Sequence, residues 1–109
     1  MTRVVSLIAV CTVFSTTVAF AQQAVERGQA VYVDQKCAIC HAIGGQGNKN
    51  GSLDGVGSKL SAEEIRTWLV NAPEMTAKTK ADRKPPMKTY TLEKADLDAL
   101  VAYLQSLKK

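Results

Sequence analysis

Apolar residues recur every three or four positions in three stretches of the chain, and this spacing predicts three amphipathic helices. The first stretch runs from residue 23 to about residue 36, and its apolar face consists of Ala24, Gly28, Val31 and Tyr32. A glycine inside a helix lowers the stability of that helix by about 1 kcal/mol relative to alanine. Gly28 is therefore either a tolerated surface residue or a point where a second helix crosses at close range.

Two further helices are predicted in the C-terminal half of the chain. A capping box of Ser61 and Glu64 begins one of them, and Asn71-Ala72-Pro73 is expected to end it. Its apolar residues are Ile65, Trp68 and Leu69. The last helix has Thr91 as its expected N-cap and runs almost to the end of the chain. Its apolar residues are Leu97, Leu100, Val101, Leu104 and Leu107.

The segments between these helices are predicted to be two long loops. Residues 42–60 contain six of the seven glycines, which is too many for regular structure, and Leu53 is the apolar residue in the middle. Residues 74–90 have no helical period and include Pro85 and Pro86. No stretch has the alternating pattern of a strand. The predicted fold class is all-α, with three main helices and two long loops.

The first 21 residues have the features of a secretory signal. Met1-Thr2-Arg3 is a short positive start, residues 4–14 are largely apolar, and Ala19-Phe20-Ala21 is a suitable cleavage site. The apolar run is shorter than the roughly 20 residues of a membrane-spanning helix. Cys11 raises the alternative of a lipoprotein signal, but Val10 stands where such signals have a small residue. We therefore expect residues 22–109 to form one exported domain, with no membrane-spanning segment after cleavage.

Composition narrows the class of protein. The exported chain would have thirteen Lys and Arg residues against ten Asp and Glu, without the basic stripe and interleaved aromatic residues typical of nucleic-acid binding. Its only cysteines would be Cys37 and Cys40. A domain of this size has a marginal core, so a large apolar cofactor would supply much of the missing burial. We expect the chain to fold poorly without it.

The candidate chemistry is concentrated in Cys37-Ala38-Ile39-Cys40-His41, a C-x-x-C-H sequence. Two thiols at this spacing can each add to a vinyl group of one haem, and the adjacent imidazole can bind the iron. The alternatives are a redox dithiol, half of a zinc site and a structural disulfide. A dithiol would need a βαβ context and zinc would need more ligands, whereas no Cys or His follows this motif.

A haem iron bound by one imidazole has a sixth position that a thioether can fill. The candidates are Met75 and Met87. Pro85-Pro86 restricts the backbone before Met87, whereas Met75 lies near a predicted helix end and is expected to pack. Trp68 is expected to pack in the core, the alternative being an indole N–H that reaches a haem propionate.

These motifs resemble those of class I c-type cytochromes over essentially the whole of residues 22–109. The matching segments are Gly28 with Tyr32, the C-x-x-C-H motif, residues 53–57, Pro86-Met87 and residues 100–104. The resemblance implies the cytochrome c fold around one covalent haem c, with its iron, attached at Cys37 and Cys40. It implies that His41 is the proximal ligand and Met87 the distal ligand.

Two further positions follow from this resemblance. In the family the first and last helices cross at a glycine, which here is Gly28. The family often has a proline two residues before the loop leucine, and the carbonyl group of that proline accepts a hydrogen bond from the proximal histidine. Gly51 occupies this position in the present chain, and its carbonyl group is still available.

The expected function is that of a one-electron carrier in the periplasm, not an enzyme. The alternatives are an electron-entry subunit of a larger dehydrogenase or oxidase, and a haem enzyme or gas sensor if Met87 is not bound. We expect a monomer or a subunit of a redox complex. Positive residues around Met87 suggest larger redox partners with an acidic docking patch, the alternative being solvated surface charge. These residues are Lys78, Lys80, Arg83, Lys84 and Lys88.

Overall fold

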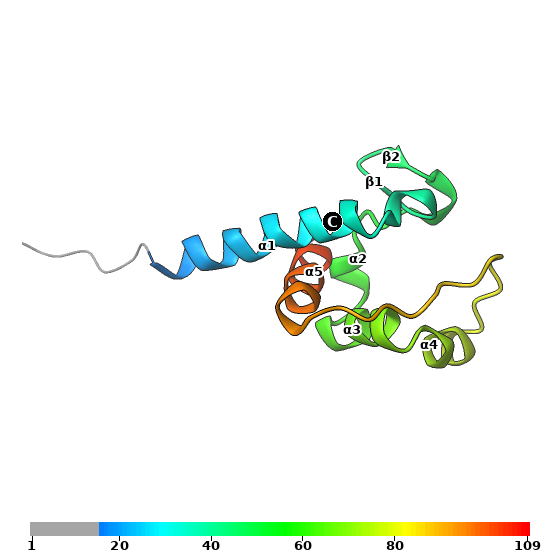
Figure 1. Ribbon diagram of the computed structural model, residues 1–109. Helices are drawn as coiled ribbons and strands as arrows, with labels where there is room; N and C mark the ends of the chain where they lie inside the picture. The colour runs from blue at the N-terminus through cyan, green and yellow to red at the C-terminus, as the bar shows by residue number, and fades with distance from the viewer. Residues whose placement is uncertain (1–15) are drawn as a thin grey trace, which may run out of the picture.

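The computed structural model describes residues 16–109, so most of the predicted signal lies outside the described residues. The helices are α1 (Thr16–Asp34), α2 (Val56–Lys59), α3 (Ala62–Val70), α4 (Ala72–Thr79) and α5 (Lys94–Ser106). Two 3₁₀ turns, η1 (Cys37–Ile39) and η2 (Lys49–Gly51), and two short strands, β1 (Ala42–Ile43) and β2 (Gln46–Gly47), lie between α1 and α2. The prediction of an all-α fold is confirmed (Figure 1).

Helices α1 and α5 cross at Gly28, and their packing organises the fold (Figure 1). A Cβ atom added to Gly28 would meet the Ala99 carbonyl oxygen and lie 2.5 Å from the Cβ atom of Tyr103. The glycine is thus required by the close approach of the two helices, as the family resemblance implied. One turn further along, the rings of Tyr32 and Tyr103 pack edge to face, with centroids 5.9 Å apart.

The hydrophobic core lies where α1, α3 and α5 meet. Its buried residues are Val31, Tyr32, Ile65, Leu69, Leu100, Val101, Tyr103 and Leu104. The predicted apolar face of the last helix is confirmed, because Leu97 and Leu107 also pack against this cluster. The capping box of α3 is present as predicted: Glu64 N donates to Ser61 Oγ, and Ser61 N donates to Glu64 Oε1, each at 3.1 Å.

The predicted loop over residues 74–90 is wrong in its first third, because α4 occupies residues 72–79. Proline lacks a backbone N–H, but the first N–H groups of a helix have no partner within that helix. Pro73 therefore lies in the first turn of α4, while Asn71 ends α3 and begins α4. The remaining irregular segment, residues 80–93, is called the methionine loop below.

The predicted loop over residues 42–60 also contains short elements. Strands β1 and β2 form an antiparallel hairpin in which Ala42 pairs with Gly47 and Ile43 pairs with Gln46. Gly44, Gly45 and Gly47 have positive φ angles, so the glycines that suggested a loop allow the tight turn. The last helix begins at Lys94 with Glu93 as its N-cap, so the prediction that Thr91 caps it is wrong.

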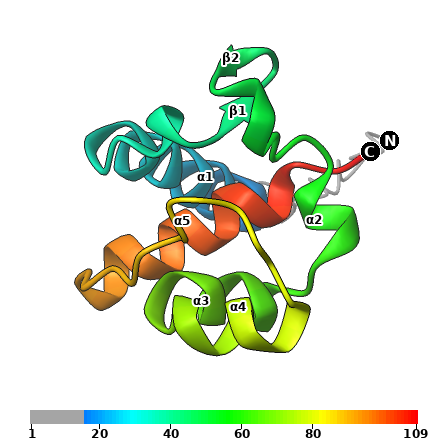
Figure 2. The same ribbon diagram turned by 90° about the vertical axis from the view of Figure 1, so that its right-hand side faces the viewer.

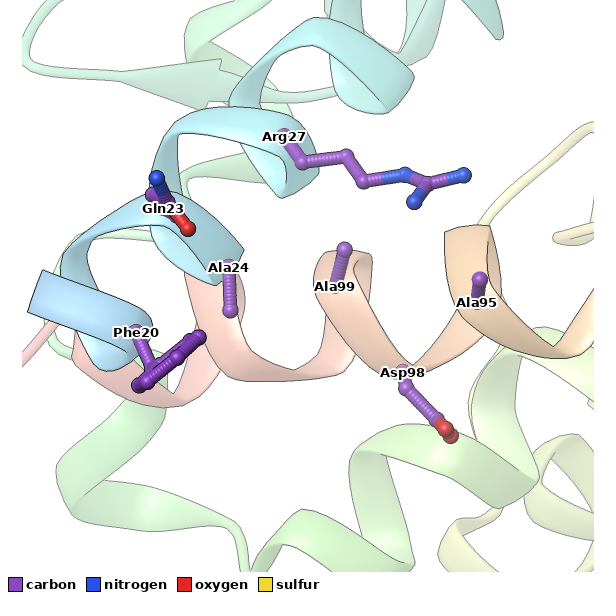
Figure 3. A pocket seen from close by; sticks show the side chains of 7 residues that line it. All are labelled: Phe20, Gln23, Ala24, Arg27, Ala95, Asp98 and Ala99. Carbon is purple, nitrogen blue, oxygen red and sulfur yellow. The ribbon is translucent and has the colours of Figure 1, made fainter. Parts of the chain in front are cut away.

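The N-terminal turns of α1 project beyond the rest of the fold (Figure 1). Where α1 approaches α5, a surface pocket of about 290 Å³ lies between Phe20, Ala24 and Arg27 on α1 and Ala95, Asp98 and Ala99 on α5 (Figure 3). Arg27 pairs with Asp96 across this contact at 2.8 Å. Within residues 16–109, no helix is long and apolar enough to cross a membrane.

Candidate functional site

A cavity of about 880 Å³ lies beside the core, between the C-x-x-C-H turn and the methionine loop. Figure 2 views this end of the molecule, where the loop passes in front of α5, with the β1–β2 hairpin above and α3 and α4 below. Cys37, Cys40, His41 and Met87 all line the cavity. The structure thus brings together the four side chains that the sequence singled out.

The C-x-x-C-H residues form one tight turn directly after α1. Lys36 takes a left-handed conformation, with φ of 57°, and so breaks the helical path. Backbone N–H groups of Cys40 and His41 then donate to the carbonyl oxygen of Cys37, at 3.1 and 2.9 Å. Cys37 is half-buried and Cys40 is exposed, and both are free thiols. Burial raises the pKa of the Cys37 thiol.

His41 is oriented by a hydrogen bond to the loop that follows it. Its Nδ1 lies 2.9 Å from the carbonyl oxygen of Gly51. Because a carbonyl group can only accept, Nδ1 carries the proton and the lone pair of Nε2 is available to a metal. Burial lowers the pKa of His41, so the imidazole is held in the neutral form that binds metals.

The two methionines occupy different environments. Met87 is half-buried and lines the cavity, whereas Met75 lies on α4, is 3% exposed and is not part of the cavity wall. The loop is anchored just after Met87, where Tyr90 N donates to Leu69 O at 2.8 Å and Ala72 N donates to Thr89 Oγ1 at 3.3 Å. Met87 is therefore the methionine that can reach a group inside the cavity.

The sequence did not identify the residues that hold the C-x-x-C-H turn from outside. Asn48 donates from Nδ2 to Ile39 O at 3.2 Å, and its backbone N–H donates to His41 O at 2.9 Å. A Cβ atom on Gly47 would meet His41 O, so only glycine allows this contact. Gly47 and Asn48 follow the motif closely in the sequence, and both residue types are typical of tight turns. The atoms that they contact, however, depend on the β1–β2 hairpin, which the sequence did not predict.

The remaining cavity wall combines apolar side chains with three aromatic residues that carry a polar group, Tyr32, Trp68 and Tyr90. Leu53 contributes to it, as does Trp68, which is half-buried and belongs neither to the buried core cluster nor to the residues packed against that cluster. The expectation that Trp68 packs in the core is thus wrong, because its side chain lines the cavity instead. Among the described residues 16–109, the buried hydroxyl of Tyr32 has no hydrogen-bond partner. Burial raises the pKa of Tyr32 to about 12.

This donor set fits a covalently attached haem. Two thiols and an imidazole lie on one turn, a thioether lies in the same cavity, and the wall is mainly apolar. The cytochrome c family model matches residues 25–108 of the chain. The chain belongs to the cytochrome c family. No curated protein and no solved structure matches it in sequence.

Membership of this family establishes the cofactor and the general activity. Cytochromes c carry haem c, an iron porphyrin held covalently, and use it to transfer electrons. This cytochrome c accordingly binds haem c and takes part in electron transport. The predictions of a c-type cytochrome, its fold and its cofactor are confirmed.

Proposed function

We propose that this cytochrome c is a one-electron carrier, not an enzyme, whose haem is attached at Cys37 and Cys40 and ligated by His41 and Met87. The observation that carries the proposal is that these four side chains line one cavity, whereas Met75 does not. When bound, the haem supplies the ferric–ferrous couple. With His41 and Met87 both bound to it, the iron would be closed to added small ligands, and the group would serve one-electron transfer alone.

The residues around the cavity favour a raised reduction potential. A soft thioether such as that of Met87 favours ferrous iron. The apolar wall, with Leu53 and Leu100 among its residues, disfavours the additional positive charge of the ferric state. The hydrogen bond from His41 to Gly51 keeps the imidazole oriented in both oxidation states.

The distal ligand is tested by substituting each methionine separately in the holoprotein. Met87→Ala should abolish the near-infrared sulfur-to-iron band, lower the reduction potential and open the iron to added ligands. Met75→Leu, a control of similar volume on α4, should leave all three unchanged. The opposite pattern would assign the ligand to Met75. If neither change mattered, an open haem site and the enzyme or sensor alternative would be favoured.

Attachment is tested by mass measurement after acid–acetone extraction. Thioether bonds to Cys37 and Cys40 should keep the haem mass on the polypeptide, whereas a non-covalent haem would be extracted. Cys37→Ala and Cys40→Ala single variants should each retain one thioether bond. A wild-type chain that lost the haem mass would refute attachment at this motif.

We also propose that residues 1–21 are a secretory signal, that residues 22–109 form the mature domain, and that the protein acts in the periplasm. Helix α1 extends upstream of Ala21, but Val18 and Phe20 are 67% and 72% exposed. Large apolar side chains so exposed contribute little to the fold, which is consistent with removal of this segment. The mass of the exported protein should correspond to a chain that begins at Gln22, plus one covalently attached haem.

We propose that a larger redox protein with an acidic patch docks at the methionine loop. Arg83, Lys84 and Lys88 on this loop line the cavity, and Asp82 is the only acidic residue between positions 78 and 88. A positive rim near the haem edge would steer an acidic partner into a productive orientation. The same docking mode would serve a free carrier or an electron-entry subunit, and co-purification distinguishes these two.

Steering is tested by the salt dependence of electron transfer to the physiological partner. The rate should fall steeply as the screening length decreases from about 10 Å at 0.1 M salt to about 3 Å at 1 M. Lys84→Glu should slow the reaction more than Lys108→Glu, an exposed control just beyond the C-terminal end of α5. Rates that are independent of salt, or equal effects of both variants, would mean that these lysines are ordinary solvated surface charges.

A further inference from the structure

The space above Gly51 is filled by a side chain from the methionine loop. A Cβ atom on Gly51 would lie 3.0 Å from Cζ of Arg83, closer still to its Nη1, and against the carbonyl oxygen of Cys40. Gly51 does not have a positive φ angle, so its backbone conformation does not require glycine. A larger residue is excluded by the backbone carbonyl oxygen of Cys40 on one side, while the guanidinium group of Arg83, at the end of a flexible side chain, fills the space on the other.

This contact connects the two sides of the cavity. Gly51 supplies the carbonyl group that accepts from Nδ1 of His41, and Arg83 lies on the same short loop as Met87. Arg83 is also part of the cavity wall. Arg83, from the loop that carries Met87, therefore lies against the Gly51 peptide, and this peptide orients His41.

The contact with Gly51 is what distinguishes Arg83 from an ordinary exposed cation. Within residues 16–109 it forms no ion pair, whereas Arg27 and Arg66 each pair with an aspartate. The planar guanidinium can cover a peptide face in a way that a lysine ammonium group cannot.

We propose that Arg83 is a positioning residue that covers the Gly51 peptide, holds its carbonyl group in place for His41, and so replaces the backbone rigidity that a proline would give. The proposal rests on the proposed ligation by His41 and Met87. Covering this peptide shields the hydrogen bond from His41 to Gly51 from water. Removing the guanidinium group uncovers that bond and removes a positive charge beside the imidazole.

The test compares Arg83→Gln and Arg83→Lys with Lys84→Gln in the holoprotein. Lys84 is the matched control, because it is the next residue of the same loop and also lines the cavity. Three quantities are measured: the near-infrared sulfur-to-iron band of the ferric protein, the exchange rate of the His41 Nδ1 proton by NMR in the ferrous protein, and the reduction potential.

Arg83→Gln should retain the near-infrared band but speed exchange of the His41 proton by about tenfold, the change expected when a net hydrogen-bond contribution is lost. It should also lower the reduction potential by more than Lys84→Gln does. Arg83→Lys should restore the potential, because the charge is kept, but not the slow exchange, because the planar group is missing.

Equal exchange rates in Arg83→Gln and Lys84→Gln would overturn the proposal. It would also be overturned if Arg83→Gln lost the near-infrared band while proton exchange stayed slow, since Arg83 would then support the methionine loop alone. A wild-type protein without the band, or without a ligating His41, would instead refute the proposed ligation, so the two failures are distinguishable.

Discussion

Substitution of Gly28 by alanine tests the helix crossing on which the fold depends. The nearest atoms to the new methyl group would be the carbonyl oxygen of Ala99 and, at 2.5 Å, the Cβ atom of Tyr103. Neither atom can rotate away, because one belongs to the backbone and the other is fixed by it. The methyl group can be accommodated only if α1 and α5 move apart.

Whether Gly28→Ala stabilises or destabilises the protein depends on this contact. On an exposed helix surface, Gly→Ala would stabilise the protein by about 1 kcal/mol. Overpacking of a tight contact destabilises by about 1–3 kcal/mol, and the backbone contact at Gly28 favours the upper part of this range. The two effects together give a net destabilisation of about 2 kcal/mol, or on the order of 10 °C in melting temperature for a domain of this size.

The assay is urea unfolding of the holoprotein followed by circular dichroism, with Gln29→Ala, an exposed residue of α1, as the control. The control should stay within about 0.5 kcal/mol of the wild type, as most surface substitutions do. The haem should remain attached in both variants. A Gly28→Ala protein as stable as the wild type, or more stable, would refute the close crossing of α1 and α5.

Two further predictions concern residues around the cavity. Asn48→Ala removes the side-chain hydrogen bonds to Ile39 O and from Asn50 N, and should lower the free energy of unfolding by about 1–2 kcal/mol. The control variant Asn50→Ala should lower it by less. Equal urea midpoints for the two variants would contradict this role of Asn48. The pKa of Tyr32, raised to about 12 from an unfolded value near 10, means that the folded state holds the phenolic proton more tightly. This contribution to stability is complete below pH 10 and is lost towards pH 12, so the urea midpoint of the wild type should fall over that interval. In Tyr32→Phe the midpoint should fall by less. An equal fall in both proteins would contradict the raised pKa of Tyr32.

The helices with a long apolar period were predictable from sequence because burial of one face decides their position. The apolar face of α5 could be predicted in this way, and the start of α3 could be predicted from its capping box. Helix α4 was missed because Pro73 has two opposite meanings. It ends a helix when placed in the interior but is well suited to the first turn, and only the tertiary position of Asn71 decides between them.

The candidate site also contains residues that could be identified from the sequence and residues that could not. Cys37, Cys40 and His41 are adjacent in sequence, and their chemistry can be recognised from spacing alone. The contacts of Asn48 and Arg83 cannot be recognised from spacing, because each contact joins segments whose relative position is set by packing. For Arg83, the sequence indicated only a positive charge in a basic run. The glycine at position 51 was noticed, but not the side chain that fills its space.

The core and the cavity share side chains, and this explains how haem and fold depend on each other. Tyr32, Ile65, Leu69, Leu100 and Leu104 belong to the buried cluster and also line the cavity. Each therefore packs against protein on one side and against the haem site on the other. Burial of apolar surface contributes about 25 cal/mol per Å², so a ring that covers these side chains extends the core across the site. The methionine loop is anchored to α3 and α4 at Thr89 and Tyr90, just after Met87, so a haem held in the cavity would join this loop to the same core.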